Sequence, residues 1–113
     1  MIKFALDGIT ASAALLIDAT NNNVIYESGS LDKLYPASIT KIMTAILTLE
    51  NAKMDEVITF TSEAVFSIEE GSSAAKVDVD EQLTVEQCLY GLMLISGNDL
   101  ANGLAEHVGD TMD

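Results

Sequence analysis

Positive charge is scarce in this chain of 113 residues, which contains no arginine. Its five lysines stand against 18 aspartates and glutamates, so the formal net charge is -13 with the histidine neutral. Proteins that bind nucleic acid or an anionic membrane surface need basic side chains gathered in a stripe to neutralise phosphate groups. The composition therefore excludes both of these partners.

Cysteine, histidine and proline occur once each, as Cys88, His107 and Pro36. A single cysteine excludes an internal disulfide, and no Cys or His spacing is typical of a zinc site. We interpret Cys88 as a buried core thiol and His107 as a residue near a helix C-terminus, with a Cys88–His107 dyad as the alternative. The acidic residues follow no EF-hand order, so we expect a solvated acidic surface and no metal site.

Long hydrophobic runs are also missing. No apolar run approaches the roughly 20 residues of a membrane span, and the segment 1–6 is too short for the core of a signal peptide. We therefore expect no transmembrane segment and no signal peptide in this chain. The composition is nevertheless 49% apolar, which is enough for one domain with a hydrophobic core.

The order of predicted elements indicates an α+β fold. Two short apolar runs flank an asparagine-rich stretch, which predicts a β-hairpin over residues 11–28. Pro36 then precedes a segment with clear helical periodicity, which predicts a helix over residues 37–50. A helical region is expected over residues 62–109, interrupted by a loop at Gly71-Ser72-Ser73.

Two helices are expected at the end of this helical region. Thr84 and Gln87 have the spacing of a capping box, so a helix should begin there. We expect it to break at Ser96-Gly97-Asn98, because Gly97 permits left-handed backbone and Asn98 or Asp99 can cap the helix that follows.

The motif Ser-x-x-Lys occurs three times, beginning at Ser30, Ser38 and Ser73, but only Ser38 and Lys41 lie on a predicted helix. Three residues apart on a helix, a hydroxyl and an amine lie on one face within reach of each other. A serine becomes a nucleophile when a neighbouring base takes its proton, and a lysine can do so when burial lowers its pKa. The apolar neighbours Ile39, Ile42 and Met43, which belong to one apolar arc of the helix, could supply that burial.

The stretches YPASITKIMTAILTLE and CLYGLMLISGNDLANGLAEHVG resemble the serine D-alanyl-D-alanine carboxypeptidases, which are low-molecular-mass penicillin-binding proteins. The resemblance runs from about residue 11 to residue 109. The order of Ser-x-x-Lys and Ser-x-Asn motifs is that of the penicillin-binding proteins and serine β-lactamases. The glycine at position 97, where β-lactamases usually have aspartate, favours the carboxypeptidases.

This resemblance implies a role for each of four residues. Ser38 would be the acylated nucleophile, Lys41 the general base and Ser96 a proton relay to the leaving amine, while Asn98 would hydrogen-bond the substrate amide. The implied substrate is a peptidoglycan stem peptide ending in D-Ala-D-Ala, and penicillins and other β-lactams would acylate the same serine. The implied location is the cell envelope outside the cytoplasm, and neither a metal nor an organic cofactor is implied.

The sequence departs from the family pattern because it has no Lys-Thr-Gly triplet. In the family this third motif lies on a sheet strand, donates the second oxyanion N–H and binds the substrate carboxylate. We therefore expect residues 1–113 to be the N-terminal part of one catalytic domain, an incomplete transpeptidase-like fold that hydrolyses little or nothing alone. The hairpin would have an open edge, so a homo-oligomer is expected. The alternatives are a β-lactamase or transpeptidase of the same fold, and a non-catalytic self-associating fragment.

Overall fold

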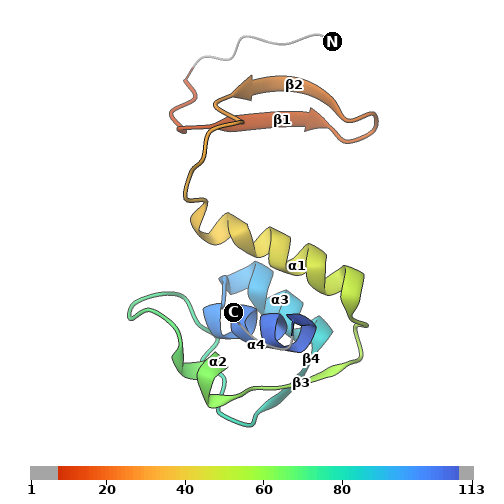
Figure 1. Cartoon of the computed structure of the whole chain (residues 1–113), viewed down its shortest axis with the longest axis vertical. Helices are drawn as coiled ribbons and strands as arrows, with labels where there is room; N and C mark the ends of the chain where they lie inside the picture. The colour runs from red at the N-terminus through yellow and green to blue at the C-terminus, as the bar shows by residue number, and fades with distance from the viewer. Residues whose placement is uncertain (1–7, 110–113) are drawn as a thin grey trace. The chain divides into compact units, whose positions relative to one another are not determined.

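The computed structural model describes residues 8–109, and the chain divides after Tyr35 into two compact units. The first unit contains an antiparallel hairpin of β1 (Ala14–Asp18) and β2 (Asn23–Ser28), which confirms the hairpin expected from the sequence (Figure 1). Its turn depends on asparagine chemistry, because Asn22 has a φ of 59° and the side chain of Asn21 accepts a hydrogen bond from the backbone N–H of Asn23.

The hairpin leaves its apolar side chains open to solvent. Leu15, Leu16 and Ile17 are 52%, 48% and 43% exposed, and the register shifts between Leu16 and Ile17. Both strands of a two-stranded sheet are edge strands, whose free backbone groups can pair with another chain.

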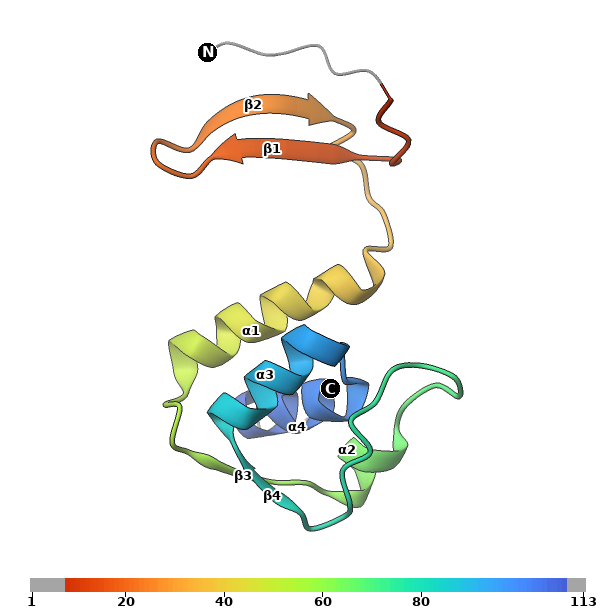
Figure 2. The same ribbon diagram turned by 180° about the vertical axis from the view of Figure 1, so that it is seen from behind.

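The second unit is mainly helical. Its elements in order are η1 (Ala37–Ile39), α1 (Thr40–Asn51), β3 (Val57–Thr59), α2 (Ser62–Phe66), β4 (Gln82–Thr84), α3 (Val85–Ile95) and α4 (Asn98–Gly109). Helix α4 contacts α1, α2, α3 and β3, and so it is the central element of the unit. Helix α1 and the antiparallel pair of β3 and β4 lie on opposite sides of α3 and α4 (Figure 1, Figure 2).

The core of this unit comes from β3, α2, α3 and α4 together with the segments between them. Its buried apolar residues are Ile58, Phe60, Ala64, Val77, Val85, Cys88, Leu92, Leu100 and Leu104. Phe60 is fully buried and lies directly against Gly103 of α4, where an added Cβ would be 2.4 Å from the phenylalanine Cε1. Because Gly103 has no side chain, the aromatic ring of Phe60 can occupy this space in the core.

The packing of α1 differs from the sequence expectation. Its apolar arc points to solvent, since Ile39, Ile42 and Met43 are 65%, 51% and 55% exposed. The opposite side packs inward, with Ala45 against the core and Thr48 only 1% exposed. Thr48 can be buried because its hydroxyl donates to the carbonyl of Thr44 within the same helix, at 2.7 Å.

The beginning of α3 confirms the predicted capping box. The Thr84 hydroxyl accepts from the backbone N–H of Gln87 at 3.2 Å, and the Gln87 side chain accepts from the backbone N–H of Thr84 at 2.9 Å. At the end of α3, the expectation that Gly97 has left-handed backbone is wrong. The residue with this conformation is Ser96, with φ 55° and ψ 43°. Helix α4 then begins at Asn98, one of the two residues expected to cap it.

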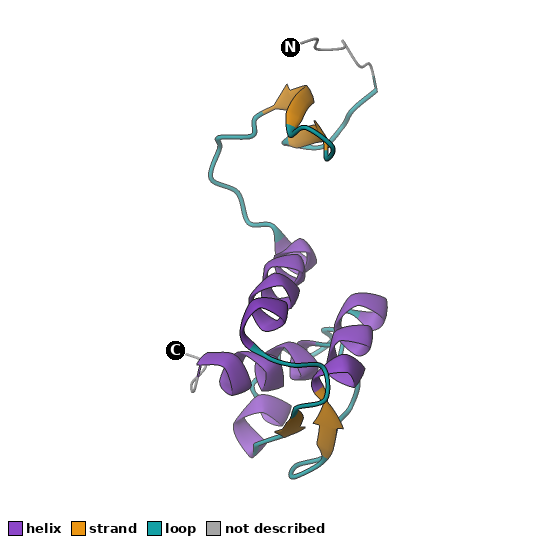
Figure 3. Ribbon diagram, turned by 90° about the vertical axis from the view of Figure 1, so that its right-hand side faces the viewer, coloured by secondary structure: helices purple, strands orange, loops and turns teal. Residues whose placement is uncertain are grey.

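The expected helical region also contains a strand and a long loop. The segment between α2 and β4 has no regular structure (Figure 3). Part of this loop packs against the beginning of α4, and its Val77 belongs to the core.

Candidate active site

Ser38 and Lys41 lie at the junction of η1 and α1, where a short 3₁₀ turn leads into the helix. The backbone N–H of Ile39 donates to the carbonyl of Pro36 at 3.3 Å. Ala37 has a φ of 50°, which is uncommon for a residue with a β-carbon. The turn presents Ser38 as an exposed residue two positions before α1, and Lys41 follows within the first turn of that helix.

A hollow of about 240 Å³ brings Ser38 and Lys41 together with Ser96. Its other lining residues are apolar, namely Ile39, Ile42, Leu92 and Met93. Two serines and one lysine thus line a mostly apolar hollow, and a serine can be activated when a neighbouring base lies within reach.

Ser96 is the one residue in 8–109 with a buried side-chain polar atom that has no hydrogen-bond partner there. Buried polar atoms are nearly always paired, and exceptions in a hollow indicate a place where another polar group binds. The left-handed backbone of Ser96 ends α3 and directs the chain back toward α4. The orphaned Oγ therefore makes this hollow the candidate functional site.

A second hollow, of about 340 Å³, shares Ser38 and Lys41 with the first and includes Asn98. Asn98 is held by the preceding loop, because its backbone N–H and its Nδ2 both donate to the carbonyl of Ser73, at 2.9 and 3.0 Å. The structure thus brings all four residues singled out in the sequence to the surroundings of the Ser38–Lys41 pair.

The apolar arc of α1 does not enclose Lys41, contrary to the sequence expectation. Ile39, Ile42 and Met43 are more than half exposed, and the apolar contacts in the hollow come in addition from Leu92 and Met93 of α3. Lys41 itself is half-buried.

The other two Ser-x-x-Lys matches lie outside helices, as the sequence predicts. Ser30 follows β2 in a turn, where its hydroxyl donates to the Glu27 carboxylate at 2.7 Å. Ser73 lies in the loop before β4, and its carbonyl is the acceptor for Asn98. Neither serine therefore shares a helical face with the lysine three residues later.

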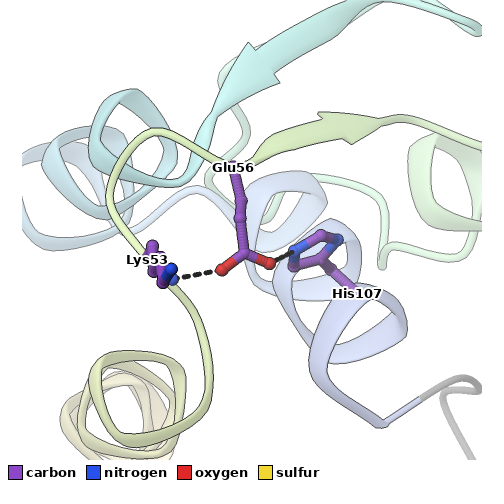
Figure 4. Close-up of polar contacts among 3 residues, drawn as sticks. All are labelled: Lys53, Glu56 and His107. Atoms are coloured by element: carbon purple, nitrogen blue, oxygen red, sulfur yellow. Dashed lines mark hydrogen bonds and ion pairs between the residues drawn. The ribbon is translucent and has the colours of Figure 1, made fainter.

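Cys88 and His107 have separate environments, so the dyad alternative is wrong. Cys88 is completely buried, and burial, with a further contribution from the charge of Asp99, raises the pKa of its thiol to about 11. His107 Nε2 lies 3.0 Å from Glu56 Oε1, and the other oxygen of Glu56 accepts from the backbone N–H of Lys53 (Figure 4). Cys88 therefore has the role of a core residue, and His107 joins α4 to the segment before β3.

Asp99 is a residue of this region that sequence reasoning noted only as a possible helix cap. It is 1% exposed, and its carboxylate accepts hydrogen bonds from the loop before β4 as well as from α4. The one feature of the sequence that could have drawn attention to Asp99 is its position directly after the Ser-x-Asn motif. Its loop partners lie 22 and 24 residues earlier, which no local pattern indicates.

Within residues 8–109, no group of three or more His, Cys, Asp or Glu side chains is arranged to hold a metal ion. The same residues include no helix with the length and apolar character needed to cross a membrane.

Comparison with known proteins gives a consistent result. Residues 3–113 match the D-alanyl-D-alanine carboxypeptidase family. The chain is 36% identical over 103 residues to D-alanyl-D-alanine carboxypeptidase DacF of Bacillus subtilis, a match that covers 87% of this chain and 26% of the relative. It is 32% identical over 104 residues to the D-alanyl-D-alanine carboxypeptidase of Streptomyces sp. strain K15, with 89% of this chain and 36% of the relative covered.

Solved structures agree. The carboxypeptidase DacD of Francisella tularensis superposes with a TM-score of 0.79 at 30% identity, covering 95% of this chain and 26% of that protein. A variant of the Streptomyces K15 DD-transpeptidase gives a TM-score of 0.81 at 32% identity, covering 92% of this chain and 42% of that protein. The chain therefore spans roughly a quarter to two fifths of the length of these proteins.

Proposed function

Because the chain belongs to the D-alanyl-D-alanine carboxypeptidase family, we propose that it carries the nucleophile side of a serine D-Ala-D-Ala carboxypeptidase site. The substrate is a peptidoglycan stem peptide that ends in D-Ala-D-Ala. The observation that supports this most is the hollow shared by Ser38, Lys41 and the orphaned hydroxyl of Ser96.

In the proposed reaction, Lys41 Nζ in its neutral form takes the proton of Ser38 Oγ as this oxygen attacks the carbonyl carbon between the two D-alanines. The tetrahedral intermediate then collapses, and the bond to the terminal D-alanine breaks. Ser96 passes the proton from Lys41 to the leaving amine, and water later hydrolyses the ester on Ser38.

Asn98 is proposed to orient the substrate. Its Nδ2 already donates to the carbonyl of Ser73, so its Oδ1 is the atom that remains to accept a hydrogen bond from a substrate amide N–H. The second hollow, which Asn98 shares with Ser38 and Lys41, is the corresponding place for the peptide chain.

We also propose that residues 1–113 act as the N-terminal part of one catalytic domain. The sequence has no Lys-Thr-Gly triplet to provide the second oxyanion donor and the carboxylate anchor. The loss of one oxyanion donor alone slows acyl transfer about 10²- to 10³-fold. The 113-residue chain should therefore react with substrate and penicillin only slowly. The proposed location is outside the cytoplasm, where peptidoglycan stem peptides occur.

A transpeptidase of the same fold is the second candidate, because the chain is 32% identical to the Streptomyces K15 DD-transpeptidase variant. The two reactions share the acyl-enzyme and differ in its fate. Water releases the acyl group in a carboxypeptidase, whereas an amino group captures it in a transpeptidase. A test with and without an added acceptor amine, such as glycine, distinguishes them.

The site can be tested by incubating the chain with a labelled penicillin and locating the adduct by intact-mass analysis and peptide mapping. We expect an adduct on Ser38 only, forming at least about 100-fold more slowly than on the Streptomyces K15 enzyme run in parallel. Ser38→Ala and Lys41→Ala should abolish the adduct, whereas Ser30→Ala, a change in another Ser-x-x-Lys, should not alter it.

Three outcomes would contradict the proposal. An adduct on another residue, or an adduct that persists in Lys41→Ala, would contradict the assigned roles. The absence of any adduct above that of the urea-unfolded chain would mean that Ser38 is not activated. Rapid and stoichiometric labelling would instead show that the chain needs no further oxyanion donor.

A further inference from the structure

Asp99 is a buried carboxylate with no part in the proposed reaction. It is 1% exposed and lies in the first turn of α4. Its Oδ1 accepts from the backbone N–H groups of Ala75 and Leu100, both at 2.9 Å, and its Oδ2 accepts from the N–H of Val77 at 3.1 Å. A buried charge is costly unless several donors compensate it, so the three N–H groups account for its presence.

Two of these donors belong to the loop before β4, where no strand or helix satisfies the backbone. Between them lies Lys76, whose φ of 62° turns the chain, so that the N–H groups on either side of it meet the same carboxylate. Two residues before Ala75, the carbonyl of Ser73 accepts both hydrogen bonds from Asn98. The segment 73–77 is thus attached to α4 by Asn98 at one end and by Asp99 at the other.

These contacts determine where the Asn98 side chain lies. The Asn98 amide is held by the carbonyl of Ser73, and the place of that carbonyl depends on the anchoring of the segment 73–77 by Asp99. We propose that Asp99 is a positioning residue that orients Asn98 toward the substrate through this segment. The relevance of Asn98 to substrate rests on the function proposed above, whereas the positioning itself does not.

The residue between Ser96 and Asn98 fits the same arrangement. Gly97 is buried, and an added Cβ there would be 3.2 Å from Asp99 Oδ1 and 3.2 Å from Leu100 Cδ1. A side chain at position 97 would therefore press on the carboxylate that anchors the loop. The charge of Asp99 also extends into the core, where it contributes to the raised pKa of Cys88.

The role requires a carboxylate and not merely a side chain of that size. Aspartate has two acceptor oxygens, and both are used here. In Asp99→Asn the side chain has the same shape, but one oxygen becomes an NH₂ group that faces a backbone N–H. The loop should then lose the hydrogen bond from the N–H of Ala75 or of Val77, and that N–H group would have no acceptor.

The first experiment uses NMR on the 113-residue chain. In the wild type, we expect scalar couplings across the hydrogen bonds from the Ala75 and Val77 nitrogens to the Asp99 carboxylate carbon. In Asp99→Asn, the backbone amide exchange of these two residues should become about tenfold faster or more. The reference amides are those of Phe60 and Val85, which donate to the backbone carbonyls of Glu81 and Glu56 and should not change. Asp78→Asn, which neutralises an exposed acid of the same loop, is the matched control and should leave these rates unchanged.

The decisive signal is the side-chain NH₂ of Asn98. The proton that donates to the Ser73 carbonyl should be shifted downfield and protected from solvent exchange in the wild type and in Asp78→Asn, and should lose both the shift and the protection in Asp99→Asn. An unchanged Asn98 signal in Asp99→Asn would overturn the proposal, and so would equal acceleration at Phe60 and Val85. If Asp99→Asn does not fold, the wild-type couplings decide alone, and their absence overturns it.

The second experiment connects positioning to acylation. The rate of penicillin adduct formation on Ser38 should fall about tenfold in Asp99→Asn and remain unchanged in Asp78→Asn. If the Asn98 amide loses its hydrogen bond in Asp99→Asn but the rate of adduct formation does not change, the proposed link between the position of Asn98 and acylation is wrong. If the wild type forms no adduct, the proposed function fails, while the NMR experiment still decides whether Asp99 positions Asn98.

Discussion

His107 Nε2 lies 3.0 Å from Glu56 Oε1, which joins the last turn of α4 to the segment between α1 and β3. The other oxygen of Glu56 accepts from the backbone N–H of Lys53. The pKa of Glu56 is lowered from its ordinary value of 4.5, first by this backbone hydrogen bond and then by the contact with His107. One carboxylate therefore closes the turn from Lys53 to Glu56 and joins this turn to α4.

The lowered pKa of Glu56 predicts a pH dependence of stability. A carboxyl group with a lowered pKa in the folded state stabilises that state above its unfolded-state pKa, here 4.5, and this contribution is lost as pH falls through the folded-state pKa. Glu56→Gln should therefore be less stable than the wild type in urea at about pH 7, and the difference should shrink as pH falls below 4.5. Glu50→Gln, another exposed glutamate near the end of α1, is the control, and an equal loss there would contradict the prediction.

Gly103→Ala should destabilise the helical unit, because the new Cβ would lie 2.4 Å from Cε1 of the fully buried Phe60. We expect a loss of about 1–3 kcal/mol in the free energy of unfolding, measured in urea. Gly109→Ala is the matched control at the end of the same helix, since a Cβ there meets nothing within 4 Å. Similar losses for the two variants would show that the contact with Phe60 is not the cause.

Gly97 should tolerate an uncharged side chain better than an acidic one. The Cβ of either residue would lie 3.2 Å from Asp99 Oδ1, so both Gly97→Asn and Gly97→Asp should lose about 1–3 kcal/mol by overpacking. Gly97→Asp should lose more at about pH 7, because two carboxylates then repel each other. Equal melting temperatures for the two variants would contradict the expected repulsion between Asp99 and a carboxylate at position 97.

The apolar arc of α1 should contribute little to the stability of the chain. Ile46 is 43% exposed, and Ile46→Ala should change the free energy of unfolding by no more than about 0.5 kcal/mol. Leu104, which is completely buried, provides the contrast, since Leu104→Ala should cost about 2–5 kcal/mol. A large loss in Ile46→Ala would mean that this face of α1 is covered in solution.

The chain should self-associate through its hairpin, because both strands are edge strands and Leu16 is 48% exposed. Sedimentation velocity at increasing concentration should show species larger than the monomer. Leu16→Lys should reduce this association, whereas Leu31→Lys, at a 96% exposed position outside the strands, should not. A wild-type chain that remains a compact monomer at high concentration would contradict the prediction.

Features that depend on neighbouring residues could be predicted from the sequence. The capping box of Thr84 and Gln87 involves residues three positions apart, and the asparagines of the hairpin turn act within four residues. The choice of Ser38 and Lys41 over the other two Ser-x-x-Lys matches also depended on local helical periodicity. Such interactions are determined by backbone geometry over one or two turns, and they form in the same way wherever the segment is placed.

Other features were decided only when distant segments packed together. Periodicity showed that α1 has an apolar and a polar side, but contact with α4 decided that Thr48 is buried and Ile42 is exposed. The orphaned hydroxyl of Ser96 likewise results from the meeting of α1 and α3 at one hollow.

The sequence by itself determined the motifs, their order and the family to which the chain belongs, because these depend on residue identity and spacing. The tertiary structure decided which groups satisfy the buried charge of Asp99, since its donors lie 22 and 24 residues earlier, and which group meets Glu56, since His107 lies 51 residues later. Hydrogen bonds to buried groups form where the folded backbone brings donors within 3 Å or so, and no pattern in the sequence specifies that distance.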